Sequence, residues 1–154
     1  MRLRSRETDR QWMERALLQA TRCKSDCDRP RPKVGAVLVN MCGELLGEAH
    51  RGEDGPDDHA EFVVFKKVIR NAVVGATLYT TLEPCTVRRP PKPACIQYVL
   101  ASGVARVVIG IADPIPANRG RSILALHANS IDVGFFDDDL ARQVREINAS
   151  VWRL

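Results

Sequence analysis

The sequence predicts an α/β fold, a three-layer α/β/α sandwich around a mixed five-stranded sheet. The main indication is that apolar, strand-like segments alternate with segments of helical periodicity. The composition supports it, because 45% hydrophobic and 27% charged residues are typical of a globular chain that buries a core. A length of 154 residues is typical of one domain, so we expect residues 1–154 to form a single domain.

The first half of the chain is expected to contain two helices separated by a β-hairpin. Apolar residues on one helical face predict a helix over about 9–24. Segments 33–39 and 44–50 flank a Met-Cys-Gly turn, which predicts two antiparallel strands. Apolar residues at helical spacing then predict a largely buried helix over 59–72.

The second half is expected to alternate strictly between strands and helices. This alternation favours right-handed crossovers and parallel strand pairing. The expected strands are 76–82, 104–111 and 130–136, and the expected helices are 95–102, 123–127 and 137–151.

Charge and hydropathy narrow the possible partners. The net charge of +4 permits a phosphorylated or nucleic-acid substrate without requiring one. Aromatic residues make up only 5% of the chain, which is few for a base-stacking surface, so we expect a small-molecule substrate and no nucleic acid. Membrane binding is not expected, because no apolar run approaches the roughly 18 residues of a membrane helix.

Cysteine usage favours a reducing compartment. The number of cysteines is odd, and the basic N-terminus is not followed by the apolar stretch of a secretory signal. We therefore expect a cytoplasmic protein without a disulfide framework, in which some thiols are candidates for metal binding. The cysteines are Cys23, Cys27, Cys42, Cys85 and Cys95.

Four residues with metal or proton chemistry occur where predicted elements meet. His59 and Glu61 open a helix, Cys85 follows a strand, and Cys95 opens the next helix. Strand ends and helix starts converge on one side of such a sheet. One histidine and two thiolates form a three-ligand zinc set that leaves a position for water, and Glu61 is placed to act as the general base.

Each of these residues also has a purely structural interpretation. Glu61 and Asp58 could form a helix cap, and the two cysteines could be inert buried thiols. A structural zinc would need a fourth ligand, for which His50 and Cys42 are the spare candidates, but both lie in or beside the hairpin. The joint pattern favours the catalytic interpretation.

The motifs HAE at 59–61 and TLEPC at 81–85, with the later Cys95, resemble the zinc-dependent cytidine/deoxycytidylate deaminase superfamily. The resemblance extends from about Asp9 through the final helix. It implies a cytidine deaminase-like fold, a Zn²⁺ cofactor and a homodimer or higher homo-oligomer. By motif, it implies that His59, Cys85 and Cys95 hold the metal and that Glu61 is the catalytic acid/base.

Within that superfamily the chain most resembles the pyrimidine deaminases of riboflavin biosynthesis. The shared features are VGAV, TLEPC, the long gap before the second cysteine and VARVV followed by a D-P-x-P motif. Two positions depart from that pattern, since Arg31 stands where an asparagine is usual before the first strand and Ile115 replaces the asparagine of D-P-N-P. From a length of 154 residues, we expect no reductase domain of the kind that bifunctional forms carry.

The resemblance implies a hydrolytic deaminase that releases ammonia from an aminopyrimidine, with a phosphorylated riboflavin-pathway pyrimidine as one candidate. Ala60, Arg31 and Arg88 are the expected substrate-binding residues. Arg88 lies in a loop with Arg89 and Lys92 that is suited to bind a phosphate, although a solvated basic loop is an equally good interpretation.

Two other functions remain open at this point. The basic composition slightly favours a tRNA adenosine deaminase, but the long cysteine gap and the few aromatic residues oppose it. The second alternative is a catalytically silent binding module with a deaminase fold. Glu61 argues against it, because a silent module would not need a carboxylate beside an open metal position.

Overall fold

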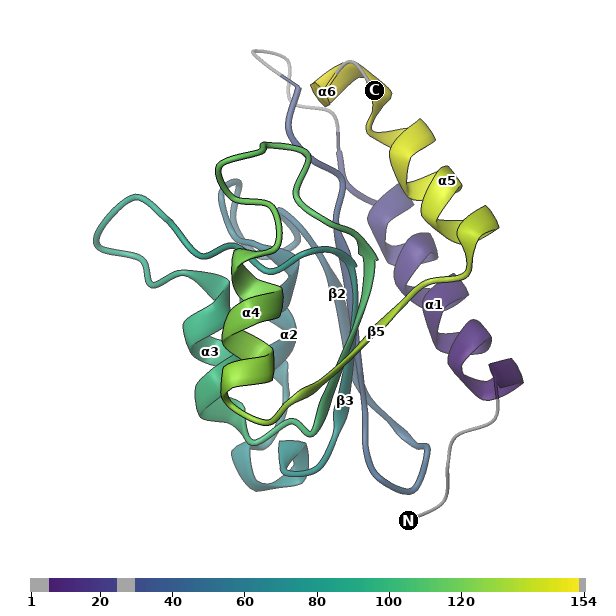
Figure 1. The fold of residues 1–154 in the computed structure, drawn as a ribbon, viewed down its shortest axis with the longest axis vertical. Coiled ribbons are helices and arrows are strands. Elements are labelled where there is room, and N and C mark those ends of the chain that lie inside the picture. The colour runs from purple at the N-terminus through teal and green to yellow at the C-terminus, as the bar shows by residue number, and fades with distance from the viewer. Residues whose placement is uncertain (1–5, 25–29, 153–154) are drawn as a thin grey trace.

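The computed structural model describes residues 6–24 and 30–152, which form a sheet between two layers of helices (Figure 1). The strand order is β2-β1-β3-β4-β5. β1 pairs antiparallel with β2 and β3, whereas β3, β4 and β5 are parallel. The predicted mixed five-stranded sheet is therefore confirmed. The strands are β1 (Gly35–Val39), β2 (Leu45–His50), β3 (Thr77–Leu82), β4 (Arg106–Ile111) and β5 (Asp132–Phe135).

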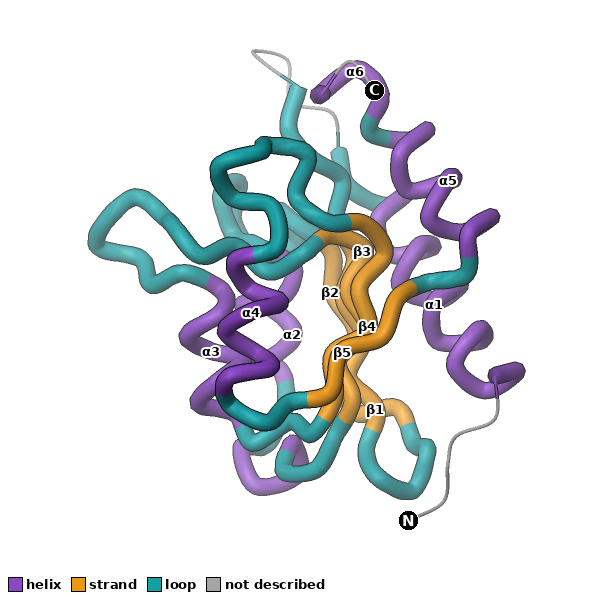
Figure 2. Tube along the Cα trace, in the orientation of Figure 1, coloured by secondary structure: helices purple, strands orange, loops and turns teal. Residues whose placement is uncertain are grey.

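The helices divide between the two faces of the sheet (Figure 2). Helices α2, α3 and α4 pack on one face, and α1 and α5 cover the other. Because both faces are covered, the central strands β1, β3 and β4 are buried along nearly their whole length rather than at alternate residues. The helices are α1 (Arg6–Thr21), α2 (Ala60–Lys67), α3 (Cys95–Ser102), α4 (Arg121–Ala128), α5 (Asp138–Ile147) and α6 (Ala149–Trp152), with a 3₁₀ turn at Arg70–Val73. None of the described helices has the length and apolar character needed to cross a membrane.

The topology brings five chain segments to one edge of the sheet. The parallel strands β3 and β4 end at this edge, where Leu82 pairs with Ile111. Since β1 runs antiparallel to β3, its first residue lies at the same edge, paired with the last residue of β2. The segments before β1 and after β2, β3 and β4 meet there with the start of α2, which is where ligands bind in α/β sheets.

Gly35, the glycine of VGAV, lets α1 pack directly on the start of β1. A Cβ atom at this position would lie 2.0 Å from the carbonyl oxygen of Ala16 in α1. No larger residue fits there without displacing the helix, so this glycine is required by a close approach of two backbones.

A buried ionic group attaches α1 to the centre of the sheet. Both terminal nitrogens of Arg106 donate hydrogen bonds to the carboxylate of Asp9, over 2.8 and 2.9 Å. The hydroxyl of the fully buried Tyr79 donates to the same carboxylate over 2.6 Å. Asp9 thus joins α1, β3 and β4, and its charge is balanced inside the core.

Four predicted helices have different bounds in the structure, and the one predicted over 123–127 is longer, spanning Arg121–Ala128. The first helix spans Arg6–Thr21 rather than 9–24. The predicted helix over 59–72 ends at Lys67, because the β-branched Val68 takes extended backbone angles and the side chain of Ile69 is 80% exposed. The predicted helix over 137–151 breaks at Asn148, whose side chain binds another segment of the chain.

Candidate metal centre

A small cavity of about 100 Å³ lies at the sheet edge where the five segments meet. All three residues of the HAE motif line it: His59, predicted to bind metal, Ala60, predicted to bind substrate, and Glu61, predicted to be catalytic. Residues at the ends of β1, β2, β3 and β4 complete the lining. The lining residues are Pro32, Val34, Arg51, His59, Ala60, Glu61, Leu82, Glu83, Cys85 and Asp113.

His59 is the N-cap residue of α2, immediately before Ala60, and its ring points toward two sulfur atoms. Its backbone is extended, and its carbonyl oxygen accepts the first helical hydrogen bond, from Val63. Its Nδ1 atom lies 3.2 Å from Sγ of Cys95 and 3.5 Å from Sγ of Cys85. The helix start therefore fixes an imidazole nitrogen beside both thiols.

Backbone amides hold Cys85 and Cys95 together across the nine-residue loop 86–94. The amide of Cys95, at the start of α3, donates to Sγ of Cys85 over 3.2 Å, and the amide of Ile96 donates to the carbonyl oxygen of Cys85. The Cys95 thiol and His59 lower the pKa of Cys85 to about 4. A helix N-terminus and a neighbouring imidazole thus favour the thiolate, the form that binds metal.

The donor set fits zinc. Within the described part of the chain, His59, Cys85 and Cys95 are the one group of three such residues that converges, with all ligand atoms within 4.8 Å of one another. Tetrahedral zinc, with Zn–S of about 2.3 Å and Zn–N of about 2.0–2.1 Å, needs ligand atoms at this range of separations. An imidazole and two sulfurs also match the zinc preference for nitrogen and sulfur donors.

The spare ligand candidates lie elsewhere. His50 Nδ1 contacts Gln19 Oε1 at 3.4 Å and Glu53 Oε1 at 3.2 Å, and Cys42 is exposed in the hairpin turn. Cys23 is buried and donates to the carbonyl oxygen of Val34. Cys27 lies outside the described residues. All four described cysteines are free thiols.

Glu61 is buried beside the three candidate ligands. Its side chain accepts a hydrogen bond from Thr80 Oγ1 over 3.2 Å, and its second oxygen lies 3.7 Å from Sγ of Cys95. Burial raises the pKa of the Glu61 carboxyl above its usual range. The alternative helix cap with Asp58 is wrong, because His59 is the capping residue and Asp58 Oδ1 binds Lys92 Nζ at 3.3 Å instead.

Basic residues surround the loop that leads into His59. Arg31 contacts Asp57 and the carbonyl oxygen of Pro56, and Arg51 donates to that same oxygen over 3.1 Å. Arg88 donates to the carbonyl oxygen of Asp57 over 2.7 Å. Two of the predicted substrate-binding residues, Arg31 and Arg88, thus hold the loop 56–58 in this structure.

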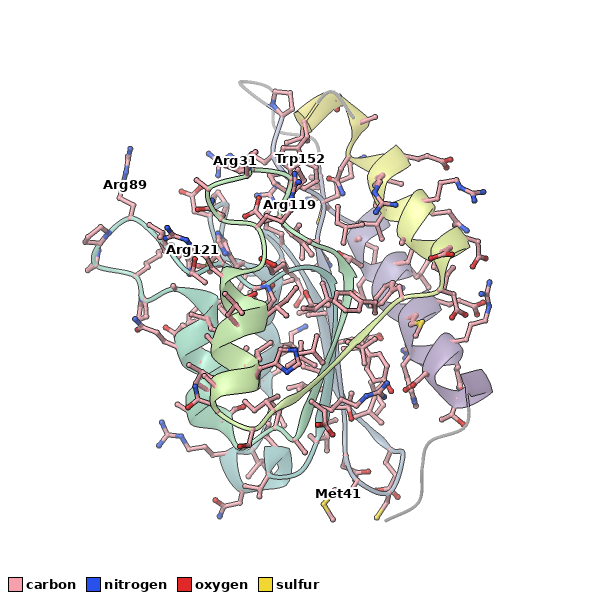
Figure 3. All side chains as sticks on the ribbon, in the orientation of Figure 1. Arg31, Met41, Arg89, Arg119, Arg121 and Trp152 are labelled. Carbon is pink, nitrogen blue, oxygen red and sulfur yellow. The ribbon has the colours of Figure 1, made fainter. Side chains whose placement is uncertain are left out.

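Arg89 behaves differently from its neighbour Arg88. Figure 3 shows it at the tip of a loop that projects from the body of the molecule, pointing away from the fold. Met41, in the hairpin turn beside Cys42, lies at the opposite end of the molecule from Arg31 and Arg119. The hairpin turn follows the Val39–Leu45 pair, at the opposite end of β1 and β2 from Gly35 and His50, so the exposed Cys42 thiol does not lie at the candidate metal centre.

Sequence reasoning missed three polar residues of the cavity. Arg51, Glu83 and Asp113 all line it. Glu83 is 3% exposed, and both its oxygens accept the backbone N–H of Gly120, at 2.8 and 3.1 Å. Glu83 and Asp113 stand inside TLEPC and D-P-I-P, so the motifs could have indicated them. Arg51 has no local signal beyond following a strand.

Comparison with known proteins agrees with this geometry. The family model described as "Cytidine and deoxycytidylate deaminase zinc-binding region" matches residues 6–111. The riboflavin biosynthesis protein RibD of Escherichia coli strain K12 is 39% identical over 125 residues, 81% of this chain and 33% of that protein. RibD of Aquifex aeolicus is 37% identical over 145 residues, 92% of this chain and 38% of that protein. The chain spans about a third of the length of these curated relatives.

A solved structure has the same fold. The diaminohydroxyphosphoribosylaminopyrimidine deaminase/5-amino-6-(5-phosphoribosylamino)uracil reductase of Thermotoga maritima superposes with a TM-score of 0.79 and 27% identity. The superposition covers 96% of this chain and 42% of that one. The similarity therefore extends over almost all of the fold, including the segments that line the cavity.

Proposed function

Because the chain belongs to the cytidine and deoxycytidylate deaminase family with a zinc-binding region, we propose that it is a hydrolytic deaminase of an aminopyrimidine. The observation that carries this proposal is the convergence of His59, Cys85 and Cys95 beside the buried carboxyl of Glu61, at a cavity that His59, Glu61 and Cys85 line. A three-ligand set with a neighbouring acid/base is the arrangement that hydrolysis at a metal requires.

We propose that His59 Nδ1 and the two cysteine sulfurs hold the zinc. A zinc ion in that position supplies a Lewis acid that lowers the pKa of bound water toward neutrality. The backbone amide that Cys95 donates to Cys85 keeps one sulfur oriented and favours its charged form. His59 is fixed by its place at the start of α2.

Glu61 is proposed to move the protons of the reaction. In hydrolytic deamination, water adds its oxygen to the ring carbon that bears the amine, a carbon–nitrogen bond breaks, and ammonia leaves. Glu61 takes one proton from water and gives it to the ring nitrogen. It then carries the second proton, from the added hydroxyl, to the amine, so that a carbonyl forms as ammonia leaves. Thr80 supports this role by orienting the carboxyl, and burial keeps bulk water from competing for the proton.

The proposed substrate is a ribosylaminopyrimidine phosphate. The relatives are named riboflavin biosynthesis proteins, and the Thermotoga maritima structure is described as a diaminohydroxyphosphoribosylaminopyrimidine deaminase/reductase. The small cavity suits the ring, with the buried Ala60 contributing backbone at its wall. Arg31 and Arg88, at the loop 56–58, are proposed to bind the phosphate.

We further propose that residues 1–154 act as one deaminase domain, in the cytoplasm, as a homodimer or higher homo-oligomer. The single sheet with helices on both faces supports the first of these. Size-exclusion chromatography with light scattering tests the oligomeric state.

Ammonia release by the zinc-loaded protein tests the proposed activity. The panel contains diaminohydroxyphosphoribosylaminopyrimidine, its dephosphorylated form, cytidine, deoxycytidylate and a tRNA anticodon stem-loop. We expect turnover of the phosphorylated aminopyrimidine and a clear loss on dephosphorylation. Preference for the RNA would instead indicate a tRNA adenosine deaminase, and no turnover of any amine would indicate a silent binding module.

A further inference from the structure

Asn148 joins the C-terminal helices to the segment that precedes β1. Its Oδ1 accepts the backbone N–H of Lys33 over 2.7 Å, and its Nδ2 donates to the carbonyl oxygen of Lys33 over 3.2 Å. The same Nδ2 donates to the carbonyl oxygen of Val144 over 3.0 Å. The side chain is 1% exposed and binds both backbone groups of one residue, as a paired strand would.

The residues on either side of Lys33 form one wall of the catalytic cavity. Pro32 and Val34 both line it. The carbonyl oxygen of Pro32 accepts the Nε–H of Arg51 over 2.6 Å, and the carbonyl oxygen of Val34 accepts the backbone N–H of Arg51 over 2.9 Å. The segment held by Asn148 therefore carries an apolar part of the wall and two carbonyls that hold Arg51, one through its guanidinium and one through its backbone N–H.

We propose that Asn148 is a positioning residue for substrate binding, which acts by fixing the backbone of Lys33 and through it the wall formed by Pro32, Val34 and Arg51. The proposal rests on the proposed function and extends it to the C-terminal part of the chain, which lies outside the matched residues 6–111. The candidate metal ligands and Glu61 belong to other segments, so Asn148 is expected to affect substrate binding more than the chemical step.

The break between α5 and α6 follows from the same contact. Asn148 is the C-cap residue of α5, with φ −110° and ψ 8°, and the apolar pattern across 140–151 would otherwise continue as one helix. A carboxamide has a donor and an acceptor on one rigid group, which is what pairing with a backbone amide and carbonyl requires. A hydrophobic residue at 148 would leave both groups of Lys33 without this partner.

Asn129 provides a matched control. It is the C-cap residue of α4, with φ −103° and ψ 17°, and its Nδ2 donates to the carbonyl oxygen of Ala125, four residues earlier. This reproduces the bond of Asn148 to Val144 within its own helix, but Asn129 is exposed and its side chain does not line the cavity. Equal substitutions at the two positions therefore separate the bonds to Lys33 from a general helix-end effect.

The experiment compares Asn148→Ala and Asn148→Asp with Asn129→Ala and Asn129→Asp in the full chain. Asn148→Asp keeps the size of the side chain but turns an oxygen toward the carbonyls of Lys33 and Val144, so it tests the contact if the alanine variant does not fold. Four quantities are measured: zinc content, kcat and KM with diaminohydroxyphosphoribosylaminopyrimidine, and hydrogen exchange of peptides covering residues 32–35.

We expect both Asn148 variants to keep their zinc, to raise KM about ten-fold and to keep kcat within about three-fold. Alanine removes both hydrogen bonds to Lys33, and aspartate removes the one that Nδ2 donates. Exchange in residues 32–35 should accelerate by a similar factor, and both Asn129 variants should match the unmodified protein. General destabilisation would lower the active fraction, and hence kcat, without raising KM.

Three results would overturn the proposal: an unchanged KM in folded Asn148 variants, an equal rise in KM for the Asn129 variants, or unchanged exchange in residues 32–35. The exchange measurement needs no substrate. If the unmodified protein fails to turn over the pyrimidine, the proposed function is wrong. Hydrogen exchange in residues 32–35 of the Asn148 variants still decides the structural part of the proposal: faster exchange supports the contact, and unchanged exchange contradicts it.

Discussion

The backbone amide of Cys95 donates a hydrogen bond to Sγ of Cys85 over 3.2 Å, although ten positions separate the two residues in the chain. The N-terminus of α3 thus supplies one candidate ligand and orients the other. Because backbone structure places both the amide and the thiol, the fold brings the candidate ligands together.

The first prediction concerns metal content. Cys95→Ala removes one of three ligands and the residue that contacts both His59 and Glu61, so the purified variant should retain little zinc. Metal analysis by mass spectrometry, normalised to protein concentration, measures this. One zinc per chain is expected in the unmodified protein.

The control for that measurement replaces the other thiols. Cys23→Ser, Cys27→Ser and Cys42→Ser combined should leave the zinc content unchanged, since Cys23 binds the carbonyl oxygen of Val34 and Cys42 is exposed in the hairpin turn. Loss of zinc from a folded triple variant would show that the ligand assignment is wrong.

The second prediction concerns the loop after β4. Both oxygens of Glu83 accept the N–H of Gly120, which begins α4, and the intervening loop carries Asp113 into the cavity. Glu83→Ala should therefore raise KM about ten-fold or more, because a charged group with buried partners is lost. Glu83→Gln keeps one acceptor oxygen, so its KM in steady-state kinetics should lie between those of the unmodified protein and Glu83→Ala. Identical kinetics in all three proteins would exclude this role.

The third prediction concerns folding stability. Asp9→Asn removes the charge that Arg106 and Tyr79 share inside the core, and we expect the free energy of unfolding to fall by about 2–4 kcal/mol. Urea denaturation measures the change. Asp139→Asn is the control, because Asp139 pairs with Arg10 on the surface, where ion pairs contribute little. A larger loss of unfolding free energy in Asp139→Asn than in Asp9→Asn would contradict the prediction that the buried group contributes more.

Much of the architecture could be predicted because it depends on local pattern. The strands read as apolar runs, and the HAE and TLEPC motifs placed His59, Glu61 and Cys85 at element ends that converge in the structure. Convergence follows from the order of strands and helices, since parallel strands end at one edge of a sheet.

Two of the differences arose where a long-range contact overrides local pattern. The apolar stripe across 140–151 predicts one helix, but Asn148 binds Lys33, 115 residues away, and the helix breaks. Arg51 gave no signal because it is held by the carbonyls of Pro32 and Pro56, which only the folded chain brings to it. Such contacts leave no periodicity in the sequence.

The direct test of the central claim is ammonia release by Glu61→Gln, measured together with zinc content and melting temperature. If Glu61 carries the protons, the variant should keep its zinc and its fold and lose at least ~10²–10⁴-fold in kcat, since glutamine matches the shape of glutamate but cannot transfer a proton. The substrate is whichever amine the unmodified protein turns over. Turnover close to that of the unmodified protein would contradict the proposed mechanism, even with zinc fully bound.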